Sequence, residues 1–266
     1  MTTHIDELMT FLSGSITPFH AVEVMAKTLQ RAGFEQLDQF DAVRMTPGKG
    51  YFVVHQGSSL MAVRAGQSGV ETGLRLVGAH TDSPNLSVKP NPVKGRDGCI
   101  QLGVDVYGGA LLNPWFDRDL GMAGRVTMLT PDNALRTTLF DTGRAVAVIP
   151  SLAIHLDREA NTQRSINRQK DVVPLVMLGE HEQYDLKAWL AQELARVDSQ
   201  WQGARVMDYE LSLYDTQPPN QIGIDGDFIT SARLDNLLSC FAGMRALIDA
   251  DDAEWSLFVA TDHEEV

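Results

Sequence analysis

The sequence is poor in cysteine and has no segment that would direct it to a membrane. Cys99 and Cys240 are the only two cysteines in 266 residues, and they are neither paired nor in CxxC spacing. This excludes a disulfide-stapled secreted fold and favours a reduced, cytoplasmic setting. Met1 to Leu12 lack a basic segment followed by an apolar core, so no signal peptide is expected. No apolar run approaches the ~20 residues that a membrane-spanning helix needs.

Basic residues are also scarce. The chain has 22 Lys and Arg against 35 Asp and Glu, which gives a formal net charge of −13. A chain this acidic repels nucleic acid, so no nucleic-acid partner is expected. Its length of 266 residues is enough for one large domain or two. The composition therefore favours a globular enzyme over a membrane or nucleic-acid-binding protein.

Two adjacent glutamates, Glu264 and Glu265, follow a short apolar run near the end of the sequence. Residues 257–260 (Leu-Phe-Val-Ala) predict a buried strand, whose carboxyl end is where open α/β sheets bind ligands. Successive side chains on an extended backbone point in opposite directions, so one glutamate could bind a cation while the other handles a proton. A solvated acidic loop is the alternative interpretation.

Two other segments place a possible metal ligand beside a regular element. Residues 74–79 predict another strand, and His80 and Asp82 follow it directly. A metal-binding imidazole usually donates its second ring N–H to a carboxylate or carbonyl, and Asp82 is spaced to be that partner of His80. Asp235 stands just before an apolar run that predicts a helix, where an aspartate could equally be an ordinary helix cap.

Three motifs, in order along the chain, resemble the aspartyl aminopeptidase family of co-catalytic zinc peptidases. They are Gly-Ala-His-Thr-Asp-Ser-Pro at residues 78–84, Arg-Leu-Asp-Asn-Leu at 233–237 and Asp-His-Glu-Glu-Val at 262–266. The resemblance continues through residues 107–110, 115–120, 149–156 and 214–216, so it spans nearly the whole chain. It implies a zinc-peptidase-like α/β/α catalytic domain, incomplete at its carboxyl end, with an inserted β-rich domain.

The resemblance also implies a role for each matching residue. His80 would bind one zinc ion, Asp235 would bridge two zinc ions, Glu265 would bind the other, and Glu264 would be the general base. Two cations held in this way activate a water molecule and polarise the substrate carbonyl. In the family the chain continues with Gly-Ser and later supplies another aspartate and another histidine ligand. Because a catalytic zinc normally has three protein ligands, we expect the 266-residue chain alone to retain metal poorly and to be inactive.

The order of the candidate ligands predicts a discontinuous catalytic domain. His80 precedes a β-rich middle stretch and Asp235 follows it, which suggests a catalytic domain of residues 1–88 plus 229–266 and an inserted domain of residues 89–228. The resemblance implies that the insert makes the dimer contacts of a large homo-oligomer. It also implies that His155, in the insert, reaches a neighbouring subunit's active site to act on substrate. From the sequence alone, an ordinary histidine with its hydrogen bonds satisfied is the alternative.

Local patterns predict the elements around the first motif. A helix is expected to begin at Thr17 and Pro18 and to end at Gly33. Residues 51–54 and 60–63 flank a Gly-containing turn, so they are expected to form a hairpin.

Further elements are predicted in the second half of the chain. Residues 144–149 read as a strand and a helix is expected near residues 184–197. The resemblance implies a cis peptide bond between Asp235 and Asn236. The strand at residues 257–260 is expected to be an exposed sheet edge or an unsupported core element.

Three functions are compatible with these observations. The resemblance implies a zinc aminopeptidase that removes Asp or Glu from peptide amino termini. A hydrolase of the same architecture acting on another amide is a second possibility, and an inactive form that acts only in assembly is a third. A peptidase this acidic would need a local basic group to attract acidic substrates, and the sequence does not identify that group.

Overall fold

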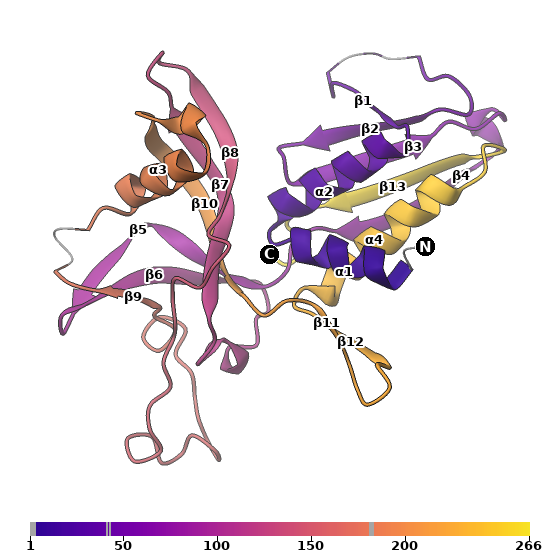
Figure 1. Cartoon of the computed structure of the whole chain (residues 1–266). Coiled ribbons are helices and arrows are strands. Elements are labelled where there is room, and N and C mark those ends of the chain that lie inside the picture. The colour runs from indigo at the N-terminus through magenta and orange to yellow at the C-terminus, as the bar shows by residue number, and fades with distance from the viewer. Residues whose placement is uncertain (1–3, 41, 43, 181–183) are drawn as a thin grey trace. The chain divides into compact units, whose positions relative to one another are not determined.

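The computed structural model describes residues 4–40, 42, 44–180 and 184–266 (Figure 1). The chain is a mixed α/β protein that divides into two compact units. The first unit comprises Met1–Ser83 and Pro218–Val266, and the second is the intervening segment Pro84–Gln217. The predicted divisions after residues 88 and 228 fall inside strands β5 (Asn85–Arg96) and β12 (Phe228–Thr230). In the structure, β5 belongs wholly to the sheet of the second unit, and β12 belongs to a hairpin of the first.

The first unit is built on a five-stranded sheet with the order β1-β2-β3-β13-β4. Its elements are α1 (His4–Gly14), α2 (Pro18–Arg31), β1 (Glu35–Gln36), β2 (Gly50–His55), β3 (Ser59–Arg64), η1 (Val70–Thr72), β4 (Leu74–His80), β11 (Asn220–Ile222), β12 (Phe228–Thr230), α4 (Leu234–Asp249) and β13 (Trp255–Thr261). The predicted hairpin is present as β2 and β3, which pair in an antiparallel manner. The strand predicted before His80 is present as β4.

Helix α2 confirms the prediction made from its end signals. Thr17 caps it by accepting a hydrogen bond from the backbone N–H of His20, and Pro18 occupies the first turn, where its missing N–H costs nothing. The chain leaves the helix through Gly33, whose φ of 86° favours glycine. The buried residues of α2 recur at helical spacing, so one face of the helix joins the core of the unit.

The helices of the first unit cover one face of its sheet (Figure 1). Phe258 and Ala260 of β13 point to that face and pack in the same core as the buried side chains of α1, α2 and α4. The packing is close, since a Cβ added at Gly243 of α4 would lie 2.7 Å from the Phe258 ring. Alternation along the strands sends Leu257 and Val259 to the opposite face, where both are only partly buried.

The expectation that residues 257–260 form a sheet edge is wrong. Strand β13 pairs with β3 on one side, antiparallel, and with β4 on the other, parallel. The outer strand on this side of the described sheet is β4. It exposes Leu74, Leu76 and Val77, which are 45%, 60% and 45% accessible. Strands of parallel pairs are usually buried on both faces, so β4 is unusually exposed for its sequence.

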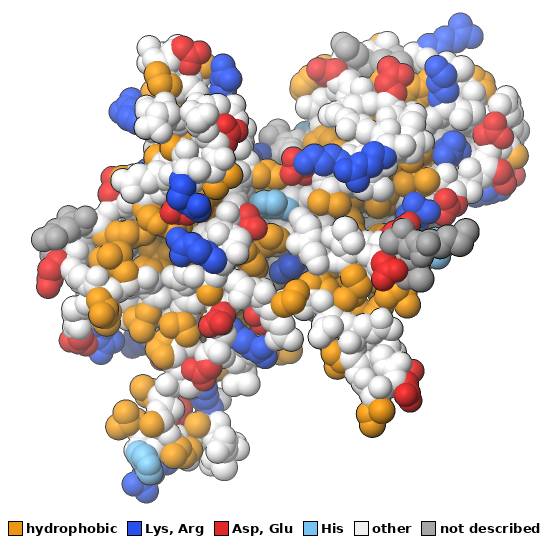
Figure 2. Space-filling model, viewed as in Figure 1, with side chains coloured by type: hydrophobic (Ala, Val, Ile, Leu, Met, Phe, Trp, Pro, Cys, Tyr) orange, Lys and Arg blue, Asp and Glu red, His pale blue; other side chains and the backbone are white. Residues whose placement is uncertain are grey.

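The hairpin formed by β11 and β12 projects from the first unit. Ile229 on its inner side packs against the core, whereas Ile222 and Phe228, which lie opposite each other, are exposed. Figure 2 shows hydrophobic and acidic side chains together at its tip, where Ile224 is fully accessible. The hairpin therefore presents apolar side chains outward.

The second unit is built on a six-stranded sheet with the order β8-β7-β10-β5-β6-β9. Its elements are β5 (Asn85–Arg96), β6 (Cys99–Tyr107), η2 (Asn113–Trp115), β7 (Leu120–Leu129), β8 (Leu135–Asp141), β9 (Leu175–Leu178), α3 (Leu186–Val197), η4 (Ser199–Trp201) and β10 (Arg205–Asp215). All pairings in this sheet are antiparallel. Helix α3, predicted near residues 184–197, is capped by Asp185 and buries one apolar face in the core of this unit.

The strand predicted at residues 144–149 is not a regular strand. Ala147, Val148 and Ile149 each form one isolated bridge, to Leu120, Leu175 and Phe116 respectively. The three partners belong to different segments, so no continuous ladder forms. The apolar run is instead explained by burial, because Ala147 and Ile149 lie in the core of the second unit. In the parts of the chain that the structure describes, no helix is both long and apolar enough to cross a bilayer.

Candidate active site

His80 stands at the carboxyl end of β4, opposite Thr261 of β13. Its ring is mostly buried, with 12% of the side chain accessible. Nδ1 lies 3.1 Å from the backbone oxygen of Asp82 and 3.3 Å from its Oδ1. An N–H at Nδ1 donating to these oxygens leaves Nε2 as the nitrogen that can bind a metal. The predicted pairing of Asp82 with the imidazole is therefore present in the geometry.

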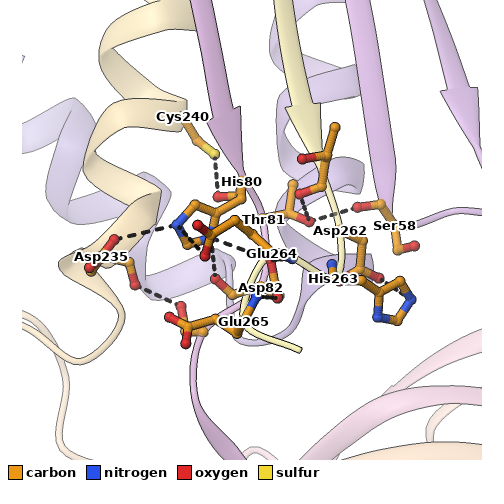
Figure 3. A network of polar contacts seen from close by, with 12 residues as sticks. Ser58, His80, Thr81, Asp82, Asp235, Cys240, Asp262, His263, Glu264 and Glu265 are labelled. Atoms are coloured by element: carbon orange, nitrogen blue, oxygen red, sulfur yellow. Dashed lines mark hydrogen bonds and ion pairs between the residues drawn. The ribbon is translucent and has the colours of Figure 1, made fainter. Parts of the chain in front are cut away.

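Asp235 approaches the other side of the imidazole. Its Oδ1 lies 3.5 Å from Nε2 of His80 (Figure 3). The peptide bond between Asp235 and Asn236 is cis, as expected from the resemblance. Both residues have non-helical dihedral angles at the start of α4, and Ser83 donates a hydrogen bond of 2.8 Å to the backbone oxygen of Asp235. Asp235 is thus not an ordinary helix cap.

The two glutamates follow the carboxyl end of β13. Oε2 of Glu264 lies 3.7 Å from Nε2 of His80. The backbone N–H groups of Glu264 and Glu265 donate to the Asp82 carboxylate at 3.3 and 3.0 Å. Of the two glutamates, Glu264 approaches Nε2 through its carboxylate, whereas Glu265 contacts Asp82 through its backbone N–H. The structure therefore brings His80, Asp82, Asp235 and both glutamates together at one end of the sheet.

The donor atoms around Nε2 are suitable for zinc. Zinc binds imidazole nitrogen and carboxylate oxygen at 2.0–2.2 Å in tetrahedral geometry, which separates two ligand atoms by about 3.3 Å. The 3.5 Å between Nε2 of His80 and Oδ1 of Asp235 agrees with that separation. However, no group of three or more His, Cys, Asp or Glu side chains in the described part of the chain is already arranged to hold a metal. The site thus fits zinc chemically but is not fully preformed.

Two residues that sequence reasoning missed fix the chain beside His80. The N–H of Thr81 donates to the backbone oxygen of Thr261 at 2.7 Å. The hydroxyl of Thr81 donates to the backbone oxygen of Ser58, also at 2.7 Å. Ser83 ties the same segment to Asp235. Their position in the polar run that follows β4 was the available signal.

Cys240 contacts the backbone of His80, and its thiol is unreactive. Its thiol donates to the backbone oxygen of His80 at 3.1 Å. Burial, together with the charge of Asp82, raises the pKa of the thiol to about 12. Because the thiolate is the form that binds metals and attacks carbonyls, Cys240 serves the site by packing and hydrogen bonding.

His155 belongs to the second unit and lies apart in the chain from these residues. It is exposed within a turn in which the N–H of Leu156 donates to the backbone oxygen of Ala153 at 2.8 Å. His155 is therefore not buried in this unit, and its role stays a prediction. An exposed imidazole in a loop that also exposes Leu152 and Ile154 is accessible to another molecule.

Comparisons with known proteins identify the family to which the chain belongs. Residues 11–266 match the family described as aminopeptidase I zinc metalloprotease (M18). The chain is 51% identical over 264 residues to a probable M18 family aminopeptidase 2 of Ectopseudomonas mendocina, covering 98% of this chain and 61% of that protein. It thus spans about three-fifths of the length of the curated relatives it matches.

Solved structures show the same fold. Chaetomium thermophilum mApe1 matches with a TM-score of 0.84 and 30% identity, over 97% of this chain and 61% of that one. The yeast mApe1 dodecamer matches with a TM-score of 0.77 and 25% identity, over 98% of this chain and 60% of that one. The family match extends from α1 through the two glutamates after β13, so the chain belongs to the M18 family of zinc metallo-aminopeptidases.

Proposed function

We propose that this chain carries the metal-binding part of an aminopeptidase that removes an amino-terminal Asp or Glu from peptides. The observation that supports the proposal most is the approach of Asp235 and Glu264 to Nε2 of His80, at 3.5 and 3.7 Å. The site lies at the carboxyl ends of parallel strands, where α/β proteins bind ligands. Because the chain covers 61% of its relative, the activity is proposed for a protein that carries this chain and the remaining length.

The residues divide the work of amide hydrolysis. His80 and Asp235 would hold one zinc ion, and Asp235 and Glu265 would hold a second. Zinc supplies a Lewis acid that polarises the substrate carbonyl and acidifies water. Glu264 accepts the proton of the attacking water and returns it to the departing amine. The backbone oxygen of Asp82 keeps the imidazole of His80 oriented with Nε2 toward the carboxylates.

The proposal extends to where and with what the protein acts. A relative of this chain is described as a dodecamer, which supports self-association of this chain into a homo-oligomer. The exposed position of His155 supports its action on substrate held by a neighbouring subunit. Two cysteines and no disulfide support a cytoplasmic setting. The net charge of −13 requires a local basic group to favour acidic substrates.

The 266 residues alone are proposed to form an incomplete site. His80, Asp235 and Glu265 give two zinc ions only three protein ligands, one of them shared, where one catalytic zinc normally has three. A chain expressed to Val266 should therefore lose zinc on dialysis and show no peptidase activity, and a longer chain should recover both. Full activity with stoichiometric zinc in the 266-residue form would contradict the assignment of ligands.

The roles of the two glutamates are tested with Glu264→Gln and Glu265→Gln in the longer protein. Glu264→Gln should lower kcat by roughly 10²–10⁴-fold, as loss of a general base does, while the zinc content measured by mass spectrometry stays unchanged. Glu265→Gln should lose zinc. The 3.7 Å approach of Glu264 to Nε2 makes this comparison informative, because retention of zinc only in Glu265→Gln would reverse the two roles.

Substrate class is tested with Asp-, Glu-, Leu- and Lys-amides at fixed ionic strength. We expect the Asp and Glu substrates to have the highest kcat/KM. A clear preference for the Leu or Lys amide would remove the acidic specificity but leave an aminopeptidase. No turnover of any amino-terminal amide by the longer, zinc-loaded protein would favour a hydrolase of another amide or a role in assembly only.

A further inference from the structure

The carboxylate of Asp82 connects two segments that are far apart in the sequence. Asp82 follows β4, whereas Glu264 and Glu265 follow β13, more than 180 residues later. Parallel pairing brings the ends of the two strands together, with His80 opposite Thr261. Beyond that pair the strand ladder stops, so the backbone of each segment needs other partners to hold its position.

Asp82 supplies those partners from both of its oxygens. Oδ1 accepts a hydrogen bond from the N–H of Glu264 at 3.3 Å, and Oδ2 accepts one from the N–H of Glu265 at 3.0 Å. Asp82 is 1% accessible, so these bonds are shielded from competing water. Hydrogen bonds to an ionised acceptor are stronger than neutral ones. The carboxylate thus holds the turn that contains both glutamates in place.

The orientation of the imidazole does not require the Asp82 side chain. Nδ1 of His80 lies 3.1 Å from the backbone oxygen of Asp82, closer than the 3.3 Å to its Oδ1. Any residue at position 82 retains that backbone acceptor. What only a short carboxylate provides is a pair of acceptor atoms for two consecutive N–H groups.

We propose that Asp82 is a positioning residue for the Glu264-Glu265 turn, which it holds so that the Glu264 carboxylate faces Nε2 of His80. The effect on catalysis rests on the proposed function, whereas the positioning of the turn rests only on the two hydrogen bonds from Glu264 and Glu265 to Asp82. Asp82→Asn tests it, because an asparagine keeps the size of the side chain and has only one acceptor atom. Its amide NH2 group would then face one of the two backbone N–H groups.

The first measurement is amide hydrogen exchange of the 266-residue chain, followed residue by residue by NMR. In Asp82→Asn, the N–H groups of Glu264 and Glu265 should exchange roughly 10- to 100-fold faster, in line with loss of a hydrogen bond to a charged acceptor. The N–H of Phe258 in β13 should keep its rate. Unchanged rates at both glutamates, or equal acceleration at Phe258, would overturn the proposal, since the latter result indicates only a general loss of stability.

Asp262→Asn is the matched control. Asp262 accepts a hydrogen bond of 2.9 Å from the N–H of His263 in the same turn. An asparagine at position 262 keeps the one acceptor atom that this bond needs, so the control should leave exchange at His263 and at the two glutamates as in the wild type. If it exposes Glu264 and Glu265 as much as Asp82→Asn does, the turn has no specific dependence on Asp82 and the proposal fails.

Kinetics of the longer, zinc-loaded protein give the second measurement. Displacement of a catalytic group by about 1 Å can cost ~10²-fold, so Asp82→Asn should lower kcat by up to that factor with little change in KM or zinc content. An unchanged kcat with faster exchange at the glutamates would contradict the catalytic consequence. If the wild-type protein hydrolyses no amide, the proposed function fails, whereas the exchange result still decides the role of Asp82.

Discussion

The two units of this chain place their polar residues differently. In the first unit, two adjacent parallel strands end at the same end of the sheet. His80, Asp82 and the two glutamates lie there, and Asp235 joins them. In the second unit, all sheet pairings are antiparallel. In an antiparallel sheet, the carboxyl ends of neighbouring strands lie at opposite ends of the sheet. The residues that follow neighbouring strands are therefore not brought together in the same way. The parallel pair β4 and β13 is therefore what assembles the site.

Each unit encloses a buried core and also leaves apolar side chains exposed on an outer strand of its sheet. The six-stranded sheet and α3 of the second unit enclose a core that includes Leu102, Met122 and Leu190, all nearly inaccessible. In the first unit, helices cover one sheet face, and β4 leaves Leu76 60% accessible. In the second unit, Leu135 on β8 and Leu178 on β9 are 67% and 78% accessible, so both units expose apolar side chains on outer strands.

The largest expected difference between the units is in metal binding. Asp235→Ala should weaken zinc binding by more than the roughly 10–100-fold that loss of an outer partner costs, because it removes a direct ligand. His155→Ala, in the second unit, should leave zinc affinity unchanged. Competition against a zinc-sensitive dye measures both. A comparable loss in His155→Ala would mean that the second unit supplies a ligand.

Core truncations should separate the stabilities of the two units. Phe258→Ala in the first unit should cost about 3–5 kcal/mol, and Leu102→Ala in the second about 2–5 kcal/mol, because both side chains are fully buried. Each should lower the midpoint of one unfolding transition and leave the other in place, as measured by calorimetry. A single transition that shifts equally in both variants would show that the units unfold together.

The exposed edge strand should respond to charge without a loss of stability. Leu76→Lys on β4 is expected to reduce aggregation, since charged side chains on an edge strand oppose pairing with another chain, and to change unfolding free energy by no more than about 0.5 kcal/mol. Leu135→Lys on β8 of the second unit, 67% accessible, is the matched substitution. Because β8 is also an outer strand of its sheet, light scattering during heating should show a similar benefit at both positions, and no benefit at either position would contradict the role given to the exposed edges.

The smallest expected difference between the units is in the reactivity of their cysteines. Burial raises the pKa of the Cys240 thiol to about 12, whereas Cys99 in the second unit is partly accessible. Iodoacetamide at pH 8 should therefore modify Cys99 alone in the folded chain. The buried neutral thiol contributes stability below its unfolded pKa near 9, and that contribution is lost as pH rises from 9 toward 12. Rapid alkylation of Cys240 in the folded chain would contradict its burial.

Local signals predicted the elements that carry the site, and long-range pairing explains what they could not predict. The cap at Thr17 and the apolar run before His80 are local, and α2 and β4 follow from them. The position of β13 between β3 and β4 depends on strand order, which residues 257–260 do not encode. Likewise, the apolar run at residues 144–149 is buried by three separate partners and has no ladder.

The site shows the same division between local and long-range information. Adjacent glutamates after a strand suggested two different roles, and Glu264 does face the imidazole. The hydrogen bonds from the N–H groups of both glutamates to Asp82 join residues more than 180 positions apart. No spacing in the sequence predicts them. The resemblance supplied Asp235, whose place beside His80 depends on the return of the chain from the second unit.

The central claim is that β4, α4 and β13 bring His80, Asp235 and the glutamates together to hold zinc. Diffraction at the zinc absorption edge from crystals of the longer, zinc-loaded protein tests it most directly. The account predicts an anomalous peak about 2.0–2.2 Å from Nε2 of His80 and from a carboxylate oxygen of Asp235. A peak bound elsewhere in the chain, with Nε2 of His80 making no bond to it, would contradict the account.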